Sequence, residues 1–206
     1  MSRRAAILAT VALGLGLSVT ASAQAPPDPT RGRDLFTAKH CARCHRPERE
    51  GAGTGPPLER LKTPQGTYSL AGRLWNHAPA MFTVLTWEGV AWPTFTQNEM
   101  ADLMAYLDAD PARDPLPDPA KGQLVLVSKG CLKCHAWKRE GARLGPDLAE
   151  RTASYAPASR WAATIWSHTP RMAAVALERG IMYPRFTGDE MVNLLAFLRS
   201  SPAIPR

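Results

Sequence analysis

Cys41-Ala42-Arg43-Cys44-His45 is one of two copies of the pattern C-x-x-C-H, and Cys131-Leu132-Lys133-Cys134-His135 is the other. Each copy offers two thiols that could bond the vinyl groups of one porphyrin, followed directly by an imidazole that could reach its iron. The pattern therefore predicts two covalently bound haem c groups. All four cysteines of the chain would be used for attachment: Cys41, Cys44, Cys131 and Cys134.

Two other chemistries use the shorter pattern C-x-x-C. It occurs in redox-active dithiols and as half of a zinc site. Haem attachment is favoured over both, because the pattern recurs with its histidine at matching places of a repeated sequence, behind an apparent export signal. No cysteine remains for a disulfide, a thiolate iron ligand or a catalytic thiol.

The first 23 residues have the features of a secretory signal peptide. A basic start at Arg3 and Arg4 precedes an apolar run over residues 5–19, and Ala21-Ser22-Ala23 offers a small-residue cleavage site. The apolar run is shorter than the roughly 20 residues that a membrane-spanning helix needs, and no second run follows. We therefore predict a signal peptide over residues 1–23, a periplasmic location and no membrane span in the mature chain.

The basic charge of the chain is smaller than its composition suggests. Removal of the leader takes away two of the 25 basic side chains and leaves 18 acidic ones, a net charge of +5. Four haem propionates, ionised as carboxylates normally are at neutral pH, would offset about four of these charges. No basic helix or basic and aromatic block is evident, so we expect no binding of nucleic acid.

The second half of the chain repeats the first. Gly55-Pro56 recurs 90 residues later as Gly145-Pro146, and beyond the middle of each copy the offset becomes 91. A period of this length is too long for a solenoid repeat and suits one small domain. We predict domain 1 at residues 28–110, domain 2 at residues 118–206, and a linker at residues 111–117 that is too rich in proline to continue a helix.

Each copy has the pattern of a helical domain. Apolar residues recur at i, i+3, i+4 and i+7 after Thr96-Gln97-Asn98-Glu99 and after Thr187-Gly188-Asp189-Glu190, which predicts two closing helices that begin at capping boxes. A shorter helix is expected from about Thr30 into the first C-x-x-C-H pattern, and likewise in the second copy. No alternating stretch is long enough for a convincing strand, so the predicted fold class is all-α.

Together these features resemble two small class I cytochromes c in tandem, as in the dihaem cytochromes of bacterial periplasms. The resemblance rests on the first helix, the C-x-x-C-H pattern, the Gly-Pro pair about ten residues beyond it, and an aromatic-Pro-x-Phe stretch before the closing helix. It covers nearly all of residues 28–202. It implies two helical domains, each folded around one haem, because a domain of about 80 residues buries too little surface to form a large core alone.

The first axial ligand of each iron follows from the attachment pattern. His45 and His135 directly follow the attachment cysteines, which makes them the proximal ligands. In the family, the carbonyl of the proline in the Gly-Pro pair accepts a hydrogen bond from the other ring N–H of this histidine, which implies Pro56 and Pro146 here. Such a bond fixes the ring and raises its basicity.

The second axial ligand departs from the family pattern. Family members usually place a methionine directly before the proline of the stretch that precedes the last helix, but Trp92 and Tyr183 occupy that position here. Neither is a plausible ligand of a low-spin electron-transfer haem. Met182 lies one residue earlier in domain 2, yet its counterpart in domain 1 is Ala91, so it could serve only one of the two copies.

Candidates common to both copies lie in the repeated pattern W-x-H-x-P-x-M. Its proline suits the first turn of a helix, which would put His77 and His168 at the mouth of that helix and Met81 and Met172 one turn inside. We favour Met81 and Met172 as iron ligands, since thioether ligation is usual in the family and raises the reduction potential. His77 and His168 are the alternative ligands, and ordinary core packing is the alternative role of the methionines.

Aromatic side chains are expected to surround each haem. Trp75 and Trp166 open the two W-x-H-x-P-x-M stretches, and Trp92 and Tyr183 precede the closing helices. We predict that all four pack against haem, with their N–H or O–H groups bonded to a polar partner.

An iron with both axial positions filled by protein cannot bind a small molecule without losing a ligand. We therefore predict a dihaem electron carrier without catalytic residues, in which the haems supply the redox chemistry and the protein supplies ligands and burial. Its expected partners are a donor and an acceptor protein of the periplasm. Two alternatives stay open: a dihaem enzyme of peroxidase type, and a gas-binding protein with one open iron site.

Overall fold

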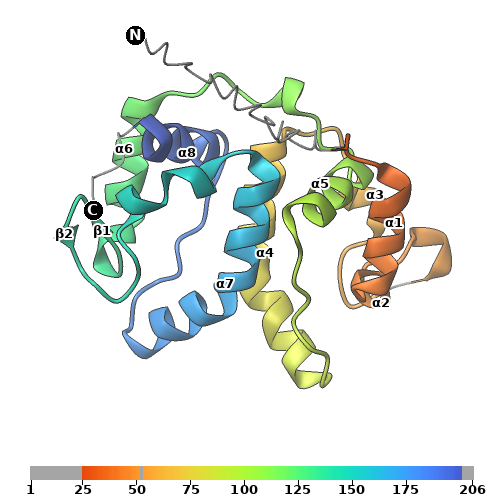
Figure 1. Cartoon of the computed structure of the whole chain (residues 1–206). Coiled ribbons are helices and arrows are strands. Elements are labelled where there is room, and N and C mark those ends of the chain that lie inside the picture. Colours follow the sequence, from red (N-terminus) through yellow and green to blue (C-terminus); the bar gives the residue numbers. More distant parts are fainter. Residues whose placement is uncertain (1–24, 52, 201–206) are drawn as a thin grey trace, which may run out of the picture.

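A computed structural model describes residues 25–51 and 53–200, so the predicted signal peptide and the last six residues lie outside the described residues. The chain forms two helical units, coloured red to green and green to blue in Figure 1. The first unit contains α1 (Pro29–Ala38), α2 (Cys41–Cys44), η1 (Glu48–Glu50), α3 (Leu58–Leu61), α4 (Thr67–Trp87) and α5 (Gln97–Tyr106).

The second unit repeats this order with small changes, after a 3-10 helix, η2 (Pro111–Arg113), in the connecting segment. It contains α6 (Pro119–Ser128), η3 (Cys131–Lys133), β1 (Ala136–Trp137), β2 (Glu140–Gly141), η4 (Leu148–Tyr155), α7 (Ala158–Glu178) and α8 (Glu190–Ser200). The all-α prediction is confirmed, since the hairpin β1–β2 is the only sheet among the described residues. None of the described helices is long and apolar enough to cross a membrane.

Each unit is closed by the packing of its first helix against its last. α1 packs on α5, and α6 packs on α8. A Cβ atom at Gly32 would overlap the backbone carbonyl of Asp102, and one at Gly122 would overlap that of Asn193. Glycine is therefore needed at both crossings, because only a residue without a side chain allows the backbones to approach so closely.

The start of each first helix is also tied to the last helix. The backbone N–H of Asp28 donates to Asp102 Oδ1 at 2.7 Å, and that of Asp118 donates to Asn193 Oδ1 at 2.8 Å. Arg31 Nε adds a bond to Asp102 Oδ2 at 2.8 Å. Burial alone would raise the pKa of Asp102, but the bonds from Arg31 and from the backbone outweigh it, so the pKa is lowered.

The first helix does not continue into the attachment pattern, so that prediction is wrong. α1 ends at Ala38, and His40 then takes a left-handed backbone conformation with φ of 66° before the short helix α2. In the second unit Gly130 makes the same turn with φ of 71°. The left-handed residue breaks the helix and lets the chain turn before the cysteines.

The closing helices follow the prediction in one unit and differ in the other. At the start of α5, Thr96 and Glu99 exchange the two hydrogen bonds of a capping box. α8 begins later, at Glu190, whose carboxylate accepts a bond from the backbone N–H of Thr187 at 2.7 Å. Gly188 has a φ of 51°, so the backbone is not helical there and only half of the predicted box forms.

Pro79 and Pro170 lie inside long helices, which corrects the prediction that a helix starts at them. α4 begins at Thr67 and α7 at Ala158. A proline in a helix leaves the carbonyl four residues earlier without its N–H partner. In α7 that carbonyl belongs to Trp166, and it accepts a bond from Trp92 Nε1 of the first unit at 3.0 Å instead. Tertiary packing thus supports a proline that sequence rules place at a helix start.

α4 and α7 lie side by side and join the two units (Figure 1). Trp75 Nε1 donates to the carbonyl of Pro184 at 2.6 Å, and Trp166 Nε1 donates to that of Pro93 at 2.7 Å. The Trp92 ring stacks on Trp166 with 4.4 Å between centroids. In each long helix, therefore, a tryptophan donates a hydrogen bond to the segment that precedes the closing helix of the other unit.

The predicted linker is attached to the first unit. Asp114 accepts hydrogen bonds from the backbone N–H of Tyr68 at 2.8 Å and from Thr67 Oγ1 at 2.5 Å, which caps the start of α4. An aspartate at a helix N-terminus also interacts favourably with the helix dipole. This contact fixes the path of the connection, while the exact domain boundaries stay a prediction.

Candidate functional site

A cavity of about 380 Å³ in the first unit brings most of its predicted site residues together. Its volume and largely apolar walls suit an organic cofactor. The predicted site residues in its walls are Cys41, Cys44, His45, Pro56, His77 and Met81.

The two histidines predicted as proximal ligands make the hydrogen bonds that the resemblance implies. His45 Nδ1 lies 2.9 Å from the carbonyl oxygen of Pro56, and His135 Nδ1 lies 2.9 Å from that of Pro146. A carbonyl oxygen only accepts, so Nδ1 must carry a proton, and in the neutral ring Nε2 then keeps its lone pair. Both imidazoles therefore present Nε2 in the state that binds a metal, with a ring orientation fixed by the second bond.

The glycine of each Gly-Pro pair leaves room for this ring. A Cβ atom at Gly55 would lie 2.5 Å from Cε1 of His45, which is closer than non-bonded atoms approach, and one at Gly145 would overlap the ring of His135. The Gly-Pro pair thus has two roles: the glycine admits the imidazole, and the proline carbonyl holds it. Sequence reasoning found the second role and missed the first.

The four cysteines are free thiols and partly buried. Burial raises the pKa of Cys41 and that of Cys131, each to about 11. A redox-active dithiol has the opposite property, a cysteine whose pKa is lowered so that the thiolate forms at neutral pH. The raised pKa of Cys41 and Cys131 therefore argues against a redox-active dithiol at either pattern.

Both candidates for the second axial ligand face the cavity. His77 and Met81 are one turn apart on α4, and residues at i and i+4 share a helix face. His77 Nδ1 lies 2.8 Å from the carbonyl of Arg73, and in α7 His168 Nδ1 lies 2.7 Å from that of Thr164. These bonds leave Nε2 free in each ring, so the choice between methionine and histidine stays a prediction.

In the second unit the structure separates the two methionines that sequence reasoning considered. Met172 is partly buried and packs against the hydrophobic core. Met182 is 89% exposed, and its side chain therefore points to solvent. This placement gives no support to Met182 as an iron ligand.

Trp75 and Trp166 lie in the interface between the units, which does not support their predicted packing against haem. Trp75 is not among the described residues that line the cavity, and it stacks on Tyr183 with 4.9 Å between centroids. Two residues along a helix turn the side chain by about 200°, so Trp75 and His77 point in opposite directions. The cavity side of α4 is therefore the His77 side.

The cavity wall also carries positive charge. Arg60 and Arg73 line it, and Arg73 Nη1 donates to Gln65 Oε1 at 2.6 Å. Guanidinium groups bind carboxylates well because their N–H donors match the spacing of the two oxygens. These arginines are suitable partners for the acidic groups of a porphyrin.

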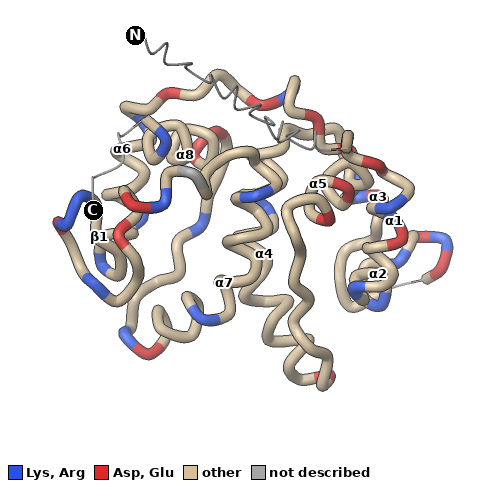
Figure 2. Tube along the Cα trace, viewed as in Figure 1, with Lys and Arg blue, Asp and Glu red and all other residues tan. Residues whose placement is uncertain are grey.

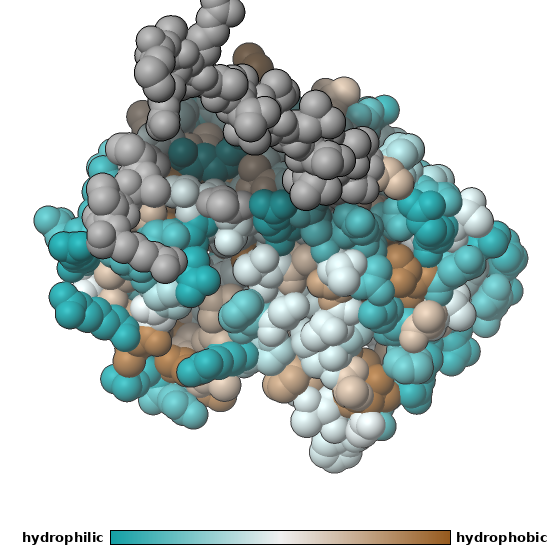
Figure 3. All heavy atoms as spheres, in the orientation of Figure 1, coloured by the Kyte–Doolittle hydropathy of each residue, from teal (hydrophilic) through white to brown (hydrophobic). Residues whose placement is uncertain are grey.

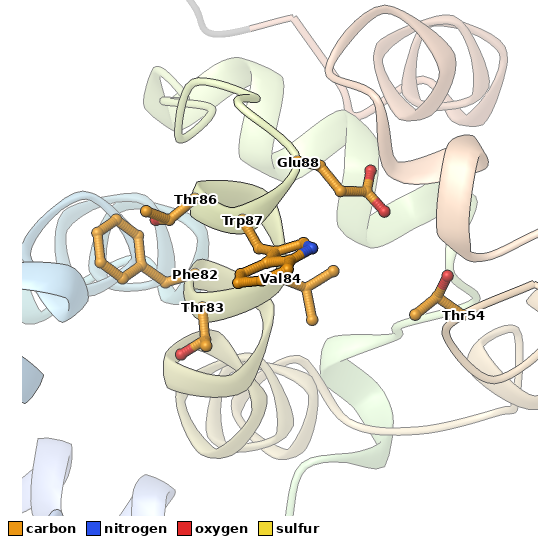
Figure 4. Close-up of a pocket in the computed structure, with 7 residues that line it drawn as sticks. All are labelled: Thr54, Phe82, Thr83, Val84, Thr86, Trp87 and Glu88. Atoms are coloured by element: carbon orange, nitrogen blue, oxygen red, sulfur yellow. The ribbon is translucent and has the colours of Figure 1, made fainter.

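A second, more open hollow of about 830 Å³ continues the cavity toward the surface. The two share Thr54 and Val84. Figure 4 shows that most of its lining comes from the end of α4, with Thr54 on a separate segment. Trp87, which lines this hollow, is an apolar surface residue that is 90% exposed.

A protein-family model described as Cytochrome c matches the chain twice, over residues 29–109 and 119–202. A search of curated proteins found no match. The two matched segments coincide with the two helical units, and each contains one C-x-x-C-H pattern. The donor set fits the group that this family carries, since each unit has two cysteines and a histidine with a free Nε2.

Proposed function

Since the chain belongs to the cytochrome c family, with one domain at each match, we propose that it carries single electrons between a donor and an acceptor protein in the periplasm. Cytochrome c domains indicate haem-based electron transfer, and bound haem supplies one-electron iron chemistry. The residues that would hold the two haems covalently are Cys41, Cys44, Cys131 and Cys134.

The observation that carries this proposal is the matched pair of histidine bonds. In both domains the imidazole donates its Nδ1 proton to a proline carbonyl and keeps Nε2 for the metal. A site for electron transfer needs ligands that do not move, because a ligand held in one orientation lowers the cost of reorganisation. Equal geometry in both domains favours two haems with the same role.

Met81 and Met172 are proposed as the second ligands, so that neither iron has an open position. The test is the absorption spectrum of the purified holoprotein. We expect two haems per chain in the pyridine haemochrome assay and a sulfur-to-iron band at long wavelength in the oxidised protein. Met81→Ala and Met172→Ala should each remove about half of this band, whereas His77→Ala and His168→Ala should leave it in place.

The alternatives give different outcomes in the same preparation. An enzyme or a gas-binding protein has one open iron, so carbon monoxide would change the spectrum of the reduced native protein at once. An electron carrier with both positions filled would show little change. If the native protein lacked the sulfur band and the histidine variants altered the spectrum, His77 and His168 would replace the methionines as ligands.

The periplasmic location depends on the predicted signal peptide. Fractionation of cells that make the full chain should find the haem-containing protein in the periplasmic fraction, without residues 1–23. Mass spectrometry of the protein recovered from this fraction then shows whether residues 1–23 have been removed.

A further inference from the structure

The two halves of the duplication have diverged in charge. Residues 28–117 contain 10 basic and 11 acidic side chains, whereas residues 118–206 contain 13 basic and 7 acidic ones. With neutral histidines, domain 1 is close to neutral and domain 2 has a net charge of +6. Two domains of common origin and similar fold therefore present different electrostatic surfaces.

Part of the excess lies where the haem of domain 2 would be attached. Figure 2 shows Lys and Arg at the hairpin β1–β2, on the left edge of the molecule, and Figure 3 shows hydrophilic side chains along this edge. Four exposed cations belong to this loop or to the C-x-x-C-H pattern itself, and we call them the basic edge: Lys133, Lys138, Arg139 and Arg143.

The loop that carries the basic edge is fastened to the attachment pattern. The backbone N–H of Ala142 donates to the carbonyl of Leu132 at 3.1 Å, and that of Gly145 donates to the carbonyl of Cys134 at 2.8 Å. The loop therefore folds back over the segment that holds both cysteines. Its charges are fixed beside the attachment site and do not belong to a remote surface.

The tip of the hairpin holds two cations in a backbone conformation that disfavours them. Lys138 and Arg139 have φ of 52° and 70°, as both central residues of a type I′ turn must. Asn-Gly is the favoured pair there, because other residues are strained at positive φ. The Asp147 carboxylate stabilises the turn by accepting hydrogen bonds from the backbone N–H groups of Lys138 and Arg139, at 3.1 and 2.6 Å. Strain of this kind often marks functional positions.

The matching surface of domain 1 is less basic, since Arg46 is the only one of its three exposed cations without an ion pair among the described residues. Its counterpart of Lys133 is Arg43, which lies 3.5 Å from Glu88, and its counterpart of Arg139 is Arg49, which lies 3.7 Å from Glu50. None of the four cations of the basic edge forms an ion pair within the described ranges 25–51 and 53–200. The same loop also contains Glu140 and Asp147, so residues 131–147 keep a net charge of +2 from four basic and two acidic side chains.

The same loop also carries an exposed apolar side chain. Leu144 directly follows Arg143 and is 49% exposed, and its counterpart in domain 1 is Thr54, which lines the cavity there. An apolar contact surrounded by charge suits a transient interface, since the charges speed the encounter and the apolar contact adds short-range affinity.

We propose that the basic edge docks an acidic redox partner protein, so that domain 2 exchanges electrons with this partner. Domain 1, where two of the three cations of the attachment loop form ion pairs, would then serve the other partner. The proposal rests on the proposed electron-transfer function and adds to it the charge of one partner and the domain that receives it.

The test uses the reduced holoprotein and two small oxidants of opposite charge in stopped-flow experiments. One electron passes from the protein to hexacyanoferrate(III), which becomes hexacyanoferrate(II), or to tris(phenanthroline)cobalt(III), which becomes the cobalt(II) complex. At about 0.01 M ionic strength we expect a fast phase with the anion that slows steeply as salt is added. Poly-L-glutamate, an acidic polypeptide, should suppress this fast phase by occupying the basic edge.

Arg139→Glu and Arg49→Glu form a matched pair of variants at equivalent positions. Arg139→Glu should slow the fast phase with hexacyanoferrate(III) about tenfold at low salt, whereas Arg49→Glu should leave it unchanged. The double variant Lys138→Asn/Arg139→Gly should slow it similarly while its melting temperature does not fall, which separates lost docking from lost folding.

The possible failures are distinguishable. If Arg49→Glu slowed the fast phase as much as Arg139→Glu, or if neither variant nor poly-L-glutamate changed it, the docking proposal would be overturned while electron transfer stood. If the protein carried fewer than two haems or reduced neither oxidant, the proposed function itself would fail.

Discussion

The hydrogen bond from Trp92 to the carbonyl of Trp166 offers a direct test of how the domains are joined. Pro170 deprives this carbonyl of its helical partner, and the indole of the other domain replaces it at 3.0 Å. Trp92→Phe keeps an aromatic ring for stacking but removes the N–H. Trp166 is 7% exposed, so water cannot readily satisfy the carbonyl that is left behind.

The expected cost follows from this burial. A buried acceptor without a partner costs about 1–3 kcal/mol, so Trp92→Phe should lower the free energy of unfolding by about that amount. In a Pro170→Ala background the N–H of residue 170 can bond to the Trp166 carbonyl within the helix. The same Trp92→Phe change should then cost about 1 kcal/mol less, which appears as a coupling energy in the double-mutant cycle.

The assay is urea unfolding of the four holoproteins, followed by far-ultraviolet circular dichroism. A matched control exists in α4, where Pro79 leaves the carbonyl of Trp75 without its helical partner. Tyr183, the counterpart of Trp92, does not donate to this carbonyl and donates to Thr169 Oγ1 at 3.4 Å instead. Tyr183→Phe and Pro79→Ala should therefore be additive. If Trp92→Phe and Pro170→Ala were also additive within about 0.3 kcal/mol, the argument that the indole replaces the helical donor would be refuted.

Three further changes test the site and the fold. Gly145→Ala should push the His135 ring off the proline carbonyl, which we expect to broaden the haem absorption bands of domain 2 and to speed loss of the axial bond on acidification. Gly122→Ala should separate α6 from α8 and lower the free energy of unfolding by more than about 2 kcal/mol, because a backbone carbonyl cannot move aside as a side chain can. Asp102 has a lowered pKa in the folded state, so its contribution to stability is present above its unfolded pKa of about 3.9 and is lost as pH falls through the folded pKa. Asp102→Asn should therefore be less stable than the native protein at pH 7, and thermal melts should show this difference shrinking toward pH 2.

The hydrogen bonds of His45 and His135 could be predicted because their geometry is local. C-x-x-C-H places two thiols and an imidazole within five residues, and Pro56 of the Gly-Pro pair lies 11 residues after His45, so no long-range packing had to be known. The all-α fold class could also be predicted, since apolar residues at i, i+3, i+4 and i+7 form one face of an α-helix and do not fit the alternation of a β-strand.

The interface could not be predicted in the same way. An apolar or aromatic side chain on a helix shows only that something covers it, and Trp75 could have been covered by haem or by the other domain. One signal was available: Trp75 and His77 differ by two positions and so point about 200° apart, which excludes a shared cavity wall. The position of Pro79 misled the helix prediction, because a proline is common in the first turn of a helix and is tolerated further in only where packing supports it.

The missing methionine and the unexpected interface have one explanation. In most relatives the segment before the closing helix supplies the second iron ligand, and here the same segment binds the other domain. The carbonyls of Pro93 and Pro184 accept bonds across the interface, and Trp92 stacks there on Trp166. A side chain at position 92 that reached back to the iron of its own domain could not also stack on the neighbouring domain. With the proposed ligands Met81 on α4 and Met172 on α7, this segment would be free to join the two domains. We therefore expect the departure from the family pattern and the close packing of the duplicated domains to occur together.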